Sequence, residues 1–275
     1  MSSPQPNTSL DLIEASAGGL LKDVQLLLES GSEIDSLDFG GMSALMAASL
    51  GGHSPVVQAL LEKGANPDLI GKEGRTALCY AACAGHGAVV RLLLDGGADP
   101  KICDQEGRTA LMEAAASNHQ QVVKLLLQGD VPVDQKDNRG ETALLEAASW
   151  GHTEVVKLIL DAGANVNIRD DLGCTALSWA CLTGNLESAE LLLREGAALD
   201  LANSEEETPL MRACMWGHTA LMEALLSSGA DLHSGDRNGN TCLIKGAAAG
   251  RKEPVEMLLI RGAKANERNR WGDPL

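Results

Sequence analysis

The sequence predicts an all-α solenoid of stacked helix-turn-helix units that carry short β-hairpin fingers. The first observation is a period of 33 residues without insertion or deletion, marked by one hydroxyl residue in each of seven successive segments: Ser43, Thr76, Thr109, Thr142, Thr175, Thr208 and Thr241. Such a period indicates one repeated supersecondary unit, because no single unit can bury its own apolar face. The second is composition: aromatic residues make up only 2% of the 275 residues, so Ala, Leu, Val and Gly must form the core.

The first half of a repeat, taken from residues 137 to 150, predicts a turn followed by a short helix. Asp137 and Gly140 stand three residues apart, a spacing typical of a tight turn in which Gly takes a positive φ. Thr142 then stands where a helix N-cap belongs, since its hydroxyl can accept a hydrogen bond from a free amide of the first turn. We expect this helix to run to about Trp150.

The second half predicts a longer helix and an extended finger. Gly151 ends the first helix, and the apolar residues between Val155 and Leu160 give the second helix a face wide enough to pack against both neighbouring repeats. Gly163 ends this helix. The polar segment 165–169 leads to the next turn as an extended finger.

These elements recur along nearly the whole chain and resemble the ankyrin repeat. The recurring residues are Gly-x-Thr-Ala-Leu, Gly-His, Val-Val-x-Leu-Leu-Leu and Gly-Ala, as in Gly74–Leu78, Gly85–His86, Val89–Leu94 and Gly97–Ala98. We count eight units, at about 10–37, 38–70, 71–103, 104–136, 137–169, 170–202, 203–235 and 236–268. A polar tail, 1–9, precedes them, and a partial ninth repeat, 269–275, follows.

Several units depart from the pattern. The first unit lacks the Thr and the Gly-His, as expected of a terminal cap. Glu206 replaces the turn Gly, which predicts a looser or differently shaped finger because Glu tolerates positive φ poorly. Gly129-Asp130-Val131-Pro132 predicts a second helix shortened by one residue and an altered finger. The partial ninth repeat has two interpretations: the chain is a segment of a longer protein, or its end lies as a strand over the eighth unit.

Bulk properties exclude some functions and locations. The net charge of −16 argues against general nucleic-acid binding, which needs a surplus of Lys and Arg. Seven scattered cysteines, an odd number, indicate thiols kept reduced in the cytoplasm or nucleus. No signal peptide and no apolar run of membrane-spanning length is present. We therefore expect a soluble monomer in the cytoplasm or nucleus.

Catalytic and metal chemistry is not expected. His53, His86, His119, His152 and His218 share one repeat position, so neighbours lie about 10 Å apart, the spacing of packed helices. Zn–N bonds of about 2 Å cannot span that distance, and we expect each His to cap or bridge the loop before its second helix. Cys181 and Cys214 stand where other repeats have Ala and behave as small buried hydrophobes. We predict no metal, no cofactor and no enzyme activity.

The resemblance implies that a partner protein binds the concave face formed by the first helices and fingers. Trp150 and Trp216 share one position two repeats apart, about 20 Å at packed-helix spacing, and Trp179 lies in the repeat between them. These rings either anchor a partner, as Trp often does, or fill gaps against the adjacent helix. The further candidates on this face are Met215, Leu182, Thr183 and Ser117.

Charges on the fingers are uneven, with Glu205 and Glu207 crowding the seventh unit. They either are ordinary solvated turn residues or match a partner with acidic residues at one end and basic residues at the other. The charged candidates are Arg108, Lys136, Arg139, Glu141, Arg169, Glu205 and Glu207.

The predicted function is a scaffold or adaptor that binds a protein or peptide. The alternatives are the recognition part of a larger enzyme or ubiquitin-ligase subunit, and the cytosolic part of a membrane scaffold or channel. Asn167 resembles the finger asparagine that asparaginyl hydroxylases modify in ankyrin proteins, and is a candidate modification site.

Overall fold

The computed structural model describes residues 8–272 and is all-α, with sixteen helices in that range. The helices follow one another in pairs. The first helix of each pair, called the inner helix below, is α1 (Thr8–Ala17), α3 (Ala44–Leu50), α5 (Ala77–Cys83), α7 (Ala110–Ala116), α9 (Ala143–Trp150), α11 (Ala176–Thr183), α13 (Pro209–Trp216) or α15 (Cys242–Ala248). The second, or outer, helix is α2 (Leu21–Glu29), α4 (Ser54–Glu62), α6 (Gly87–Asp95), α8 (Gln120–Leu126), α10 (Thr153–Asp161), α12 (Leu186–Arg194), α14 (Thr219–Ser227) or α16 (Lys252–Ile260).

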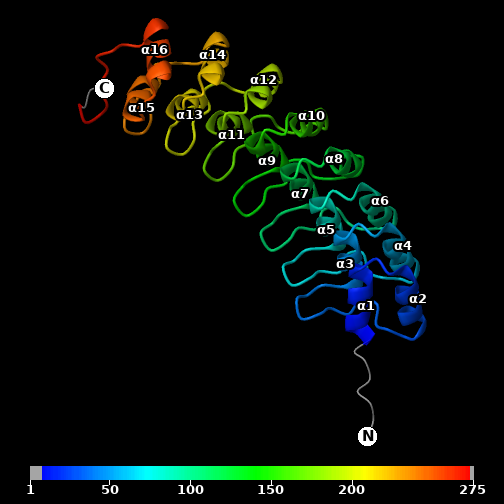
Figure 1. Ribbon diagram of the computed structural model, residues 1–275. Helices are drawn as coiled ribbons and strands as arrows, with labels where there is room; N and C mark the ends of the chain where they lie inside the picture. The colour runs from blue at the N-terminus through cyan, green and yellow to red at the C-terminus, as the bar shows by residue number, and fades with distance from the viewer. Residues whose placement is uncertain (1–7, 273–275) are drawn as a thin grey trace. The chain divides into compact units, whose positions relative to one another are not determined.

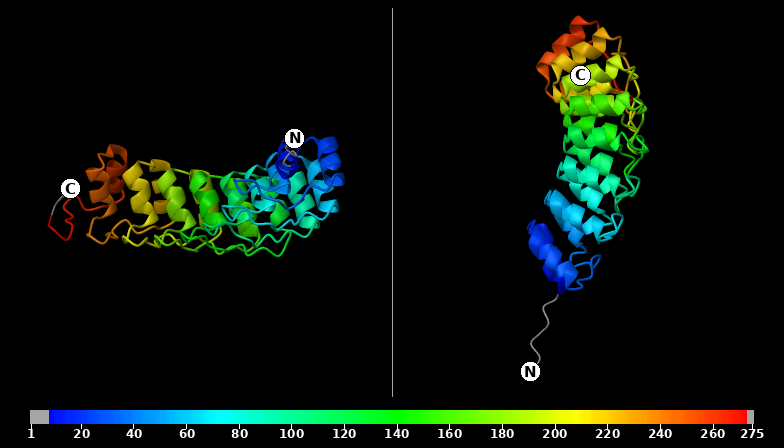
Figure 2. Two further views of the ribbon diagram at one scale, coloured as in Figure 1. Left: turned by 90° about the horizontal axis from the view of Figure 1, so that it is seen from below. Right: turned by 90° about the vertical axis from the view of Figure 1, so that its right-hand side faces the viewer.

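The chain divides into two compact units, an N-terminal unit of residues 1–138 with α1 to α8 and a C-terminal unit of residues 139–275 with α9 to α16. Within each unit, inner helices pack against inner helices of the next pair, and outer against outer. In each unit the long loops leave on the side of the inner helices (Figures 1 and 2). This stacking confirms the predicted fold class.

The ends of the predicted organisation are only partly described. Helix α1 begins at Thr8, inside the predicted polar tail, and residues 1–7 of that tail lie outside the described residues. So do residues 273–275 of the predicted partial ninth repeat.

The fingers are loops closed by backbone hydrogen bonds rather than paired strands. The Asp104 amide donates to the Arg108 carbonyl at 2.9 Å, and the Asp170 amide to the Cys174 carbonyl at 3.0 Å. Between residues 8 and 272, β-pairing is limited to two isolated bridges, Cys103–Thr109 and Gly235–Thr241. The predicted hairpins therefore form as tight turns.

The predicted N-caps form at six of the seven hydroxyl residues. The Ser43 and Thr175 hydroxyls each accept a hydrogen bond from the amide three residues on, at 3.2 Å in both cases. Thr241 has the same extended backbone conformation, but its buried hydroxyl makes no bond within the described residues. Each cap satisfies a backbone donor that the helix leaves free.

The recurring histidines connect neighbouring repeats. His86 Nε2 donates to the Leu50 carbonyl at 3.0 Å, and His119 Nε2 donates to the Cys83 carbonyl at 2.9 Å, each 36 residues back. Where one repeat has Asn185 instead, its amide donates to the Ser149 carbonyl at 2.9 Å. The predicted capping of the second helices does not form at His53, His86 or His119. Each of these histidines instead bonds to a carbonyl of the repeat before it.

Two predicted irregularities take a different form from the one expected. Glu206 takes a φ of +62° and turns its finger much as Gly140 does at +74°. Asn203 holds this finger in the usual shape, because its Oδ1 accepts from the Glu205 and Glu207 amides at 2.9 Å. The prediction of a looser or altered seventh finger was therefore wrong.

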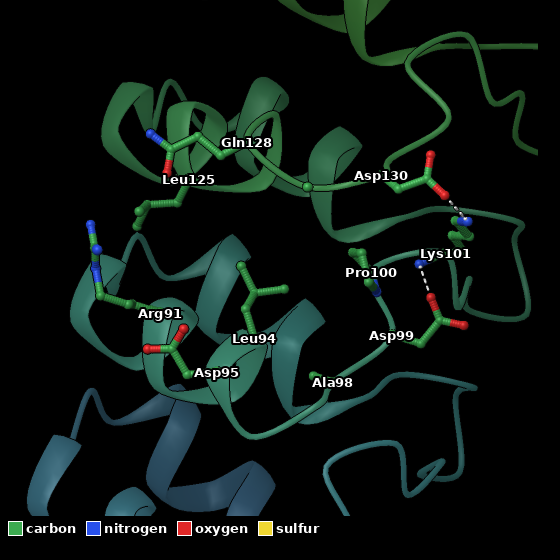
Figure 3. Close-up of a pocket in the computed structure, with 11 residues that line it drawn as sticks. Arg91, Leu94, Asp95, Ala98, Asp99, Pro100, Lys101, Leu125, Gln128 and Asp130 are labelled. Carbon is green, nitrogen blue, oxygen red and sulfur yellow. Dashed lines mark hydrogen bonds and ion pairs between the residues drawn. The ribbon is translucent and has the colours of Figure 1, made fainter.

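Helix α8 is shortened by two residues rather than one, since it has seven where most outer helices have nine. Asp130 stands where Gly97 and Gly163 take φ values of +90° and +91°, and Asp130 is not among the residues with positive φ. The chain therefore leaves the helix earlier. A hollow of about 430 Å³ opens beside it between α6 and α8 in the N-terminal unit (Figure 3).

Candidate protein-binding face

Two tryptophans are the most exposed rings on the inner helices. Trp150 and Trp216 are the last residues of α9 and α13, with 65% and 53% of their surface exposed. The Trp150 indole Nε1 donates to Glu146 Oε2 at 3.2 Å, one helical turn earlier. Neither ring is buried against a neighbouring helix, so the gap-filling interpretation does not apply to these two.

Trp179 lies between them on α11, which packs against both α9 and α13, and it has a different role. Its Nε1 donates to Asp170 Oδ2 at 2.8 Å, and the side chain is half-buried. The gap-filling interpretation therefore fits Trp179. Thr183 follows one turn later, is exposed, and donates its hydroxyl to the Trp179 carbonyl at 3.0 Å.

Arg212, on α13, lies next to the Trp179 ring. Its guanidinium carbon lies 5.0 Å from the centre of the Trp179 ring, within the range of a cation–π contact. Arg212 stands four residues before Trp216, so both project from the same side of α13. We call the surface formed by Glu146, Trp150, Trp179, Thr183, Arg212 and Trp216 the tryptophan face.

The face carries opposite charges on α9 and α13, the two inner helices on either side of α11. Glu146 lies one turn before Trp150, and Arg212 lies one turn before Trp216. Leu182 and Met215 stand beside these positions and are half-buried. A large aromatic surface flanked by a carboxylate on one side and a guanidinium on the other is suited to hold an extended polar and apolar segment.

The acidic finger does not form a free negative patch. Glu207 accepts from Lys245 Nζ at 2.6 Å, Glu205 Oε1 lies 3.4 Å from Arg237 Nη1, and Glu206 Oε2 lies 4.0 Å from Arg270 Nη2. Each acid is matched by a base from a following repeat. The expected acidic surface of the seventh unit is therefore neutralised within the C-terminal unit.

The basic finger candidates are also engaged within the fold. Arg169 donates from Nε to the Gly173 carbonyl at 2.9 Å and from Nη2 to the Ala202 carbonyl at 2.6 Å. Lys136, Arg139 and Glu141 likewise have interaction partners. Arg108, Lys136 and the exposed Ser117 belong to the N-terminal unit, whereas the residues of the tryptophan face belong to the C-terminal unit.

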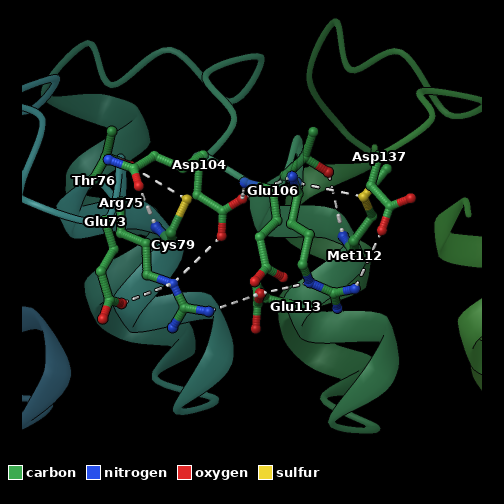
Figure 4. A network of polar contacts seen from close by, with 12 residues as sticks. Glu73, Arg75, Thr76, Cys79, Asp104, Glu106, Met112, Glu113 and Asp137 are labelled. Carbon is green, nitrogen blue, oxygen red and sulfur yellow. Dashed lines mark hydrogen bonds and ion pairs between the residues drawn. The ribbon is translucent and has the colours of Figure 1, made fainter. Parts of the chain in front are cut away.

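In the N-terminal unit the inner-helix charges form a closed network (Figure 4). Glu113, on α7, has a buried carboxylate whose Oε1 lies 2.9 Å from Arg108 Nε and 3.3 Å from Arg75 Nη2. Arg75 also approaches Asp104 at 3.4 Å, and Arg108 approaches Asp137 at 3.7 Å. Every charge in this network has a partner of opposite sign.

One ion pair, Lys101 with Asp130, lies at the edge of the hollow beside α8. Lys101 Nζ donates to Asp130 Oδ2 at 2.7 Å, and the Lys101 amide donates to Asp99 Oδ1 at 2.9 Å (Figure 3). Leu94 and Leu125 contribute its apolar floor. The Lys101–Asp130 bond lowers the pKa of the Asp130 carboxyl and raises that of Lys101.

Cys181 and Cys214 are buried thiols whose pKa values disfavour the reactive thiolate. Burial raises the pKa of the Cys181 thiol to about 12, and burial raises that of Cys214 to about 12 as well. Both side chains are fully buried, as expected for small hydrophobes. Across residues 8–272, no group of three or more His, Cys, Asp or Glu side chains is placed to hold a metal ion.

Asn167, the candidate modification site, takes part in the finger contacts. Its side-chain Oδ1 accepts from the Ala198 backbone amide of the next repeat at 2.8 Å, and the Asn167 backbone amide donates to Asn165 Oδ1 at 3.0 Å. Modification of Asn167 stays a prediction.

A family model described as ankyrin repeats (3 copies) matches residues 12–104, 89–170, 131–203 and 177–269. The chain belongs to the ankyrin-repeat family. No curated protein matches the sequence. Ankyrin repeats generally act as protein–protein interaction modules and are generally non-catalytic, which agrees with the exposed aromatic surface described above. No helix within residues 8–272 has the length and apolarity needed to cross a lipid bilayer.

Sequence reasoning missed Arg212 as a member of the face. The position four residues after each N-cap reads Ala47, Tyr80, Glu113, Glu146, Trp179, Arg212 and Lys245. This variability at a structurally constant point of the ankyrin repeat is the signal that was available. It separates these residues from the Thr, Gly and His that the fold itself requires.

Proposed function

We propose that this ankyrin-repeat protein is a non-enzymatic scaffold or adaptor whose partner protein binds across α9, α11 and α13. In this proposal each of the eight helix pairs is one ankyrin repeat, and the protein acts as a monomer. The observation that supports it most is the exposure of Trp150 and Trp216, whose positions hold small residues such as Ala84, Ser117 and Ala249 in other repeats. Large exposed rings that the fold does not bury are typical anchors of protein interfaces.

The location that fits this proposal is the cytoplasm or nucleus. All seven cysteines are free, and five of them are buried. A chain with this many unpaired thiols suits a reducing compartment. A role as the recognition part of a larger protein stays compatible with the same binding face.

The double variant Trp150→Ala, Trp216→Ala tests the proposal. We expect partner affinity to fall by roughly 30-fold or more, since the loss of even one anchoring tryptophan costs about 2 kcal/mol or more of binding free energy. The free energy of unfolding is expected to change by less than about 1 kcal/mol, because both rings are exposed. Affinity capture followed by calorimetry on a captured partner measures the first, and urea unfolding measures the second.

Trp271→Ala is the matched control, because Trp271 is 76% exposed but lies on the last finger, outside the tryptophan face. It is expected to leave the affinity unchanged. A double variant that binds every captured partner as tightly as the parent chain contradicts the proposal. A double variant that unfolds at ordinary temperature also contradicts it, since the rings would then belong to the core.

A further inference from the structure

Arg212 has a buried guanidinium without a carboxylate partner in the described part of the chain. Only 8% of the residue is exposed. Nη1 lies 2.6 Å from Cys174 Sγ and 3.2 Å from Ser178 Oγ, both of them neutral groups. The buried Nε makes no hydrogen bond to any described residue. A buried charge is ordinarily paired with an opposite one, because burial in isolation is costly.

Ion pairs in other repeats show which partner Arg212 lacks. The residue just before an N-cap meets the residue 38 positions later, on the next inner helix. Arg75 meets Glu113 at 3.3 Å in this way, and Glu207 meets Lys245 at 2.6 Å. The corresponding residue for Arg212 is Cys174, a thiol where a carboxylate would be needed.

The carboxylates nearest in the fold are committed elsewhere. Asp170 accepts from the Trp179 indole at 2.8 Å and from the Cys174 amide at 2.7 Å. Glu207 is held by Lys245 and by Asn203 at 3.1 Å. Burial alone raises the pKa of Glu207, but the Lys245 and Asn203 bonds, with the more distant charge of Arg212, lower it overall.

We propose that Arg212 binds a carboxylate of the partner protein, an Asp or Glu side chain that enters the tryptophan face beside Trp216. This inference rests on the proposed function and specifies the chemistry of the partner. The flat Trp179 ring holds the guanidinium from one side. Nη1 is taken by Cys174 and Ser178, and the buried Nε is the nitrogen left without an acceptor, so a carboxylate oxygen supplies what the site lacks. A partner that covers Trp216 also excludes water from this pair, which strengthens it.

A single negative charge fits better than a phosphate. The site has one guanidinium, and two carboxylates, Asp170 and Glu207, belong to the same neighbourhood. A doubly charged phosphate would be repelled by both of them more strongly than a carboxylate. The partner segment is therefore acidic where it meets α13.

The first test asks whether Arg212 takes a carboxylate at all. The Nε–H signal of Arg212 is followed by NMR in the full ¹⁵N-labelled chain and is assigned by its loss in Arg212→Lys. Sodium acetate is expected to shift this signal with saturation, beyond any shift caused by sodium chloride at equal ionic strength. No such shift overturns the proposal, and saturation by sodium phosphate but not acetate overturns the choice of carboxylate.

The second test separates this role from a structural one. Arg212→Met removes an unpaired buried charge, so the unfolding midpoint of the free chain is expected to stay the same or rise. Lys245→Met is the matched control at the same repeat position, where the lost cation serves two carboxylates, and its midpoint is expected to fall. A lower midpoint for Arg212→Met than for Lys245→Met overturns the proposal.

The third test uses a displayed library of random peptides selected on the full chain. Selected peptides are expected to share an acidic residue. Arg212→Met should weaken the binding of such a peptide by roughly tenfold or more, and so should Glu→Gln in the peptide. The two changes together should reduce the affinity no more than either change alone. Peptides that bind the parent chain and Arg212→Met equally overturn the proposal. Peptides insensitive to the Trp150→Ala, Trp216→Ala variant contradict the proposed function instead, while the acetate titration still decides the role of Arg212.

Discussion

Glu113 in the N-terminal unit and Arg212 in the C-terminal unit occupy the same position of their repeats, yet their surroundings differ. Glu113 lies between two arginines that are in turn held by further acids (Figure 4). Arg212 faces a thiol, a hydroxyl and an indole ring. The fold can satisfy a charge at this position, and at Arg212 it does not.

The difference separates charges that are paired within the fold from a buried charge that has no partner of opposite sign in the described residues. A closed network such as that of Glu113 contributes to stability and offers little to a ligand, since every group has a partner. The unpaired guanidinium of Arg212 adds no such ion pair to the fold and lacks a partner of opposite charge. In our proposal the same repeat position therefore serves stability in one unit and recognition in the other.

The largest expected effect on the free energy of unfolding comes from removing Glu113, the shared carboxylate of the closed network. Glu113→Ala leaves Arg75 and Arg108 facing each other without their shared carboxylate, and we expect a loss of about 3 kcal/mol in the free energy of unfolding. Urea unfolding of the full chain measures it. Glu113→Gln keeps the shape and should lose less; an unchanged midpoint for Glu113→Ala would contradict the structural role of the network.

A smaller effect is expected at Lys245, the closed position within the C-terminal unit. Burial alone raises the pKa of Asp236, but bonds from Lys245 and Asn240 outweigh it, and the pKa lies below its ordinary value, as does that of Glu207. Carboxyls with lowered pKa contribute stability above their ordinary range, about pH 4, and lose it as pH falls through the folded-state values.

Lys245→Met is accordingly expected to cost about 2 kcal/mol at pH 7, and less as the pH is lowered through 4 to 3. Urea unfolding at pH 7, 5, 4 and 3 compares the variant with the parent chain. Lys252→Met is the control, since Lys252 is exposed and pairs only with Glu256 on its own helix at 3.7 Å. A stability difference that does not shrink in acid would contradict the assignment.

The smallest expected effect on the free energy of unfolding comes from giving Arg212 a carboxylate partner within the chain. Cys174→Glu copies the Glu207–Lys245 geometry one repeat earlier, and Arg75, Arg108 and Glu141 show that this position accepts long side chains. We expect a gain of about 1 kcal/mol in the free energy of unfolding. The acetate-induced shift of the Arg212 Nε–H signal should disappear. Cys174→Gln is the uncharged control; a variant that still responds to acetate would contradict the carboxylate assignment.

The repeated elements were predictable because their residues recur at a fixed spacing. The caps at Ser43 and Thr175 join residues three apart in sequence, and His86 stands at a position that is His in five of the repeats. The charges were not predictable in this way. Glu205 and Glu207 look like an acidic surface in the sequence, but Arg237 and Lys245 of the next repeat neutralise them.

The two structural errors have local causes. The seventh finger keeps its shape because Asn203 accepts both of the amides that the turn must satisfy, which compensates for the strain at Glu206. Helix α8 ends two residues early, where Gly129 stands one position before the usual glycine and Asp130 does not take the positive φ of Gly97 and Gly163. For the tryptophan face, the two exposed rings could be found from the sequence, whereas the missing partner of Arg212 is seen only in its contacts with Cys174, Ser178 and Trp179.

The fingers have a consequence for how such a chain can change over evolutionary time. The Gln105 amide donates to the Glu73 carbonyl, and the Ser204 amide donates to the Leu172 carbonyl, the same bond in two different repeats. Because each finger makes the same backbone hydrogen bond to the finger before it, duplication or loss of one whole repeat leaves the series of finger-to-finger bonds unbroken. The tryptophan face has no such tolerance, since α9, α11 and α13 contribute different side chains in a fixed order. Gene rearrangements that the backbone accepts would therefore erase the recognition surface first.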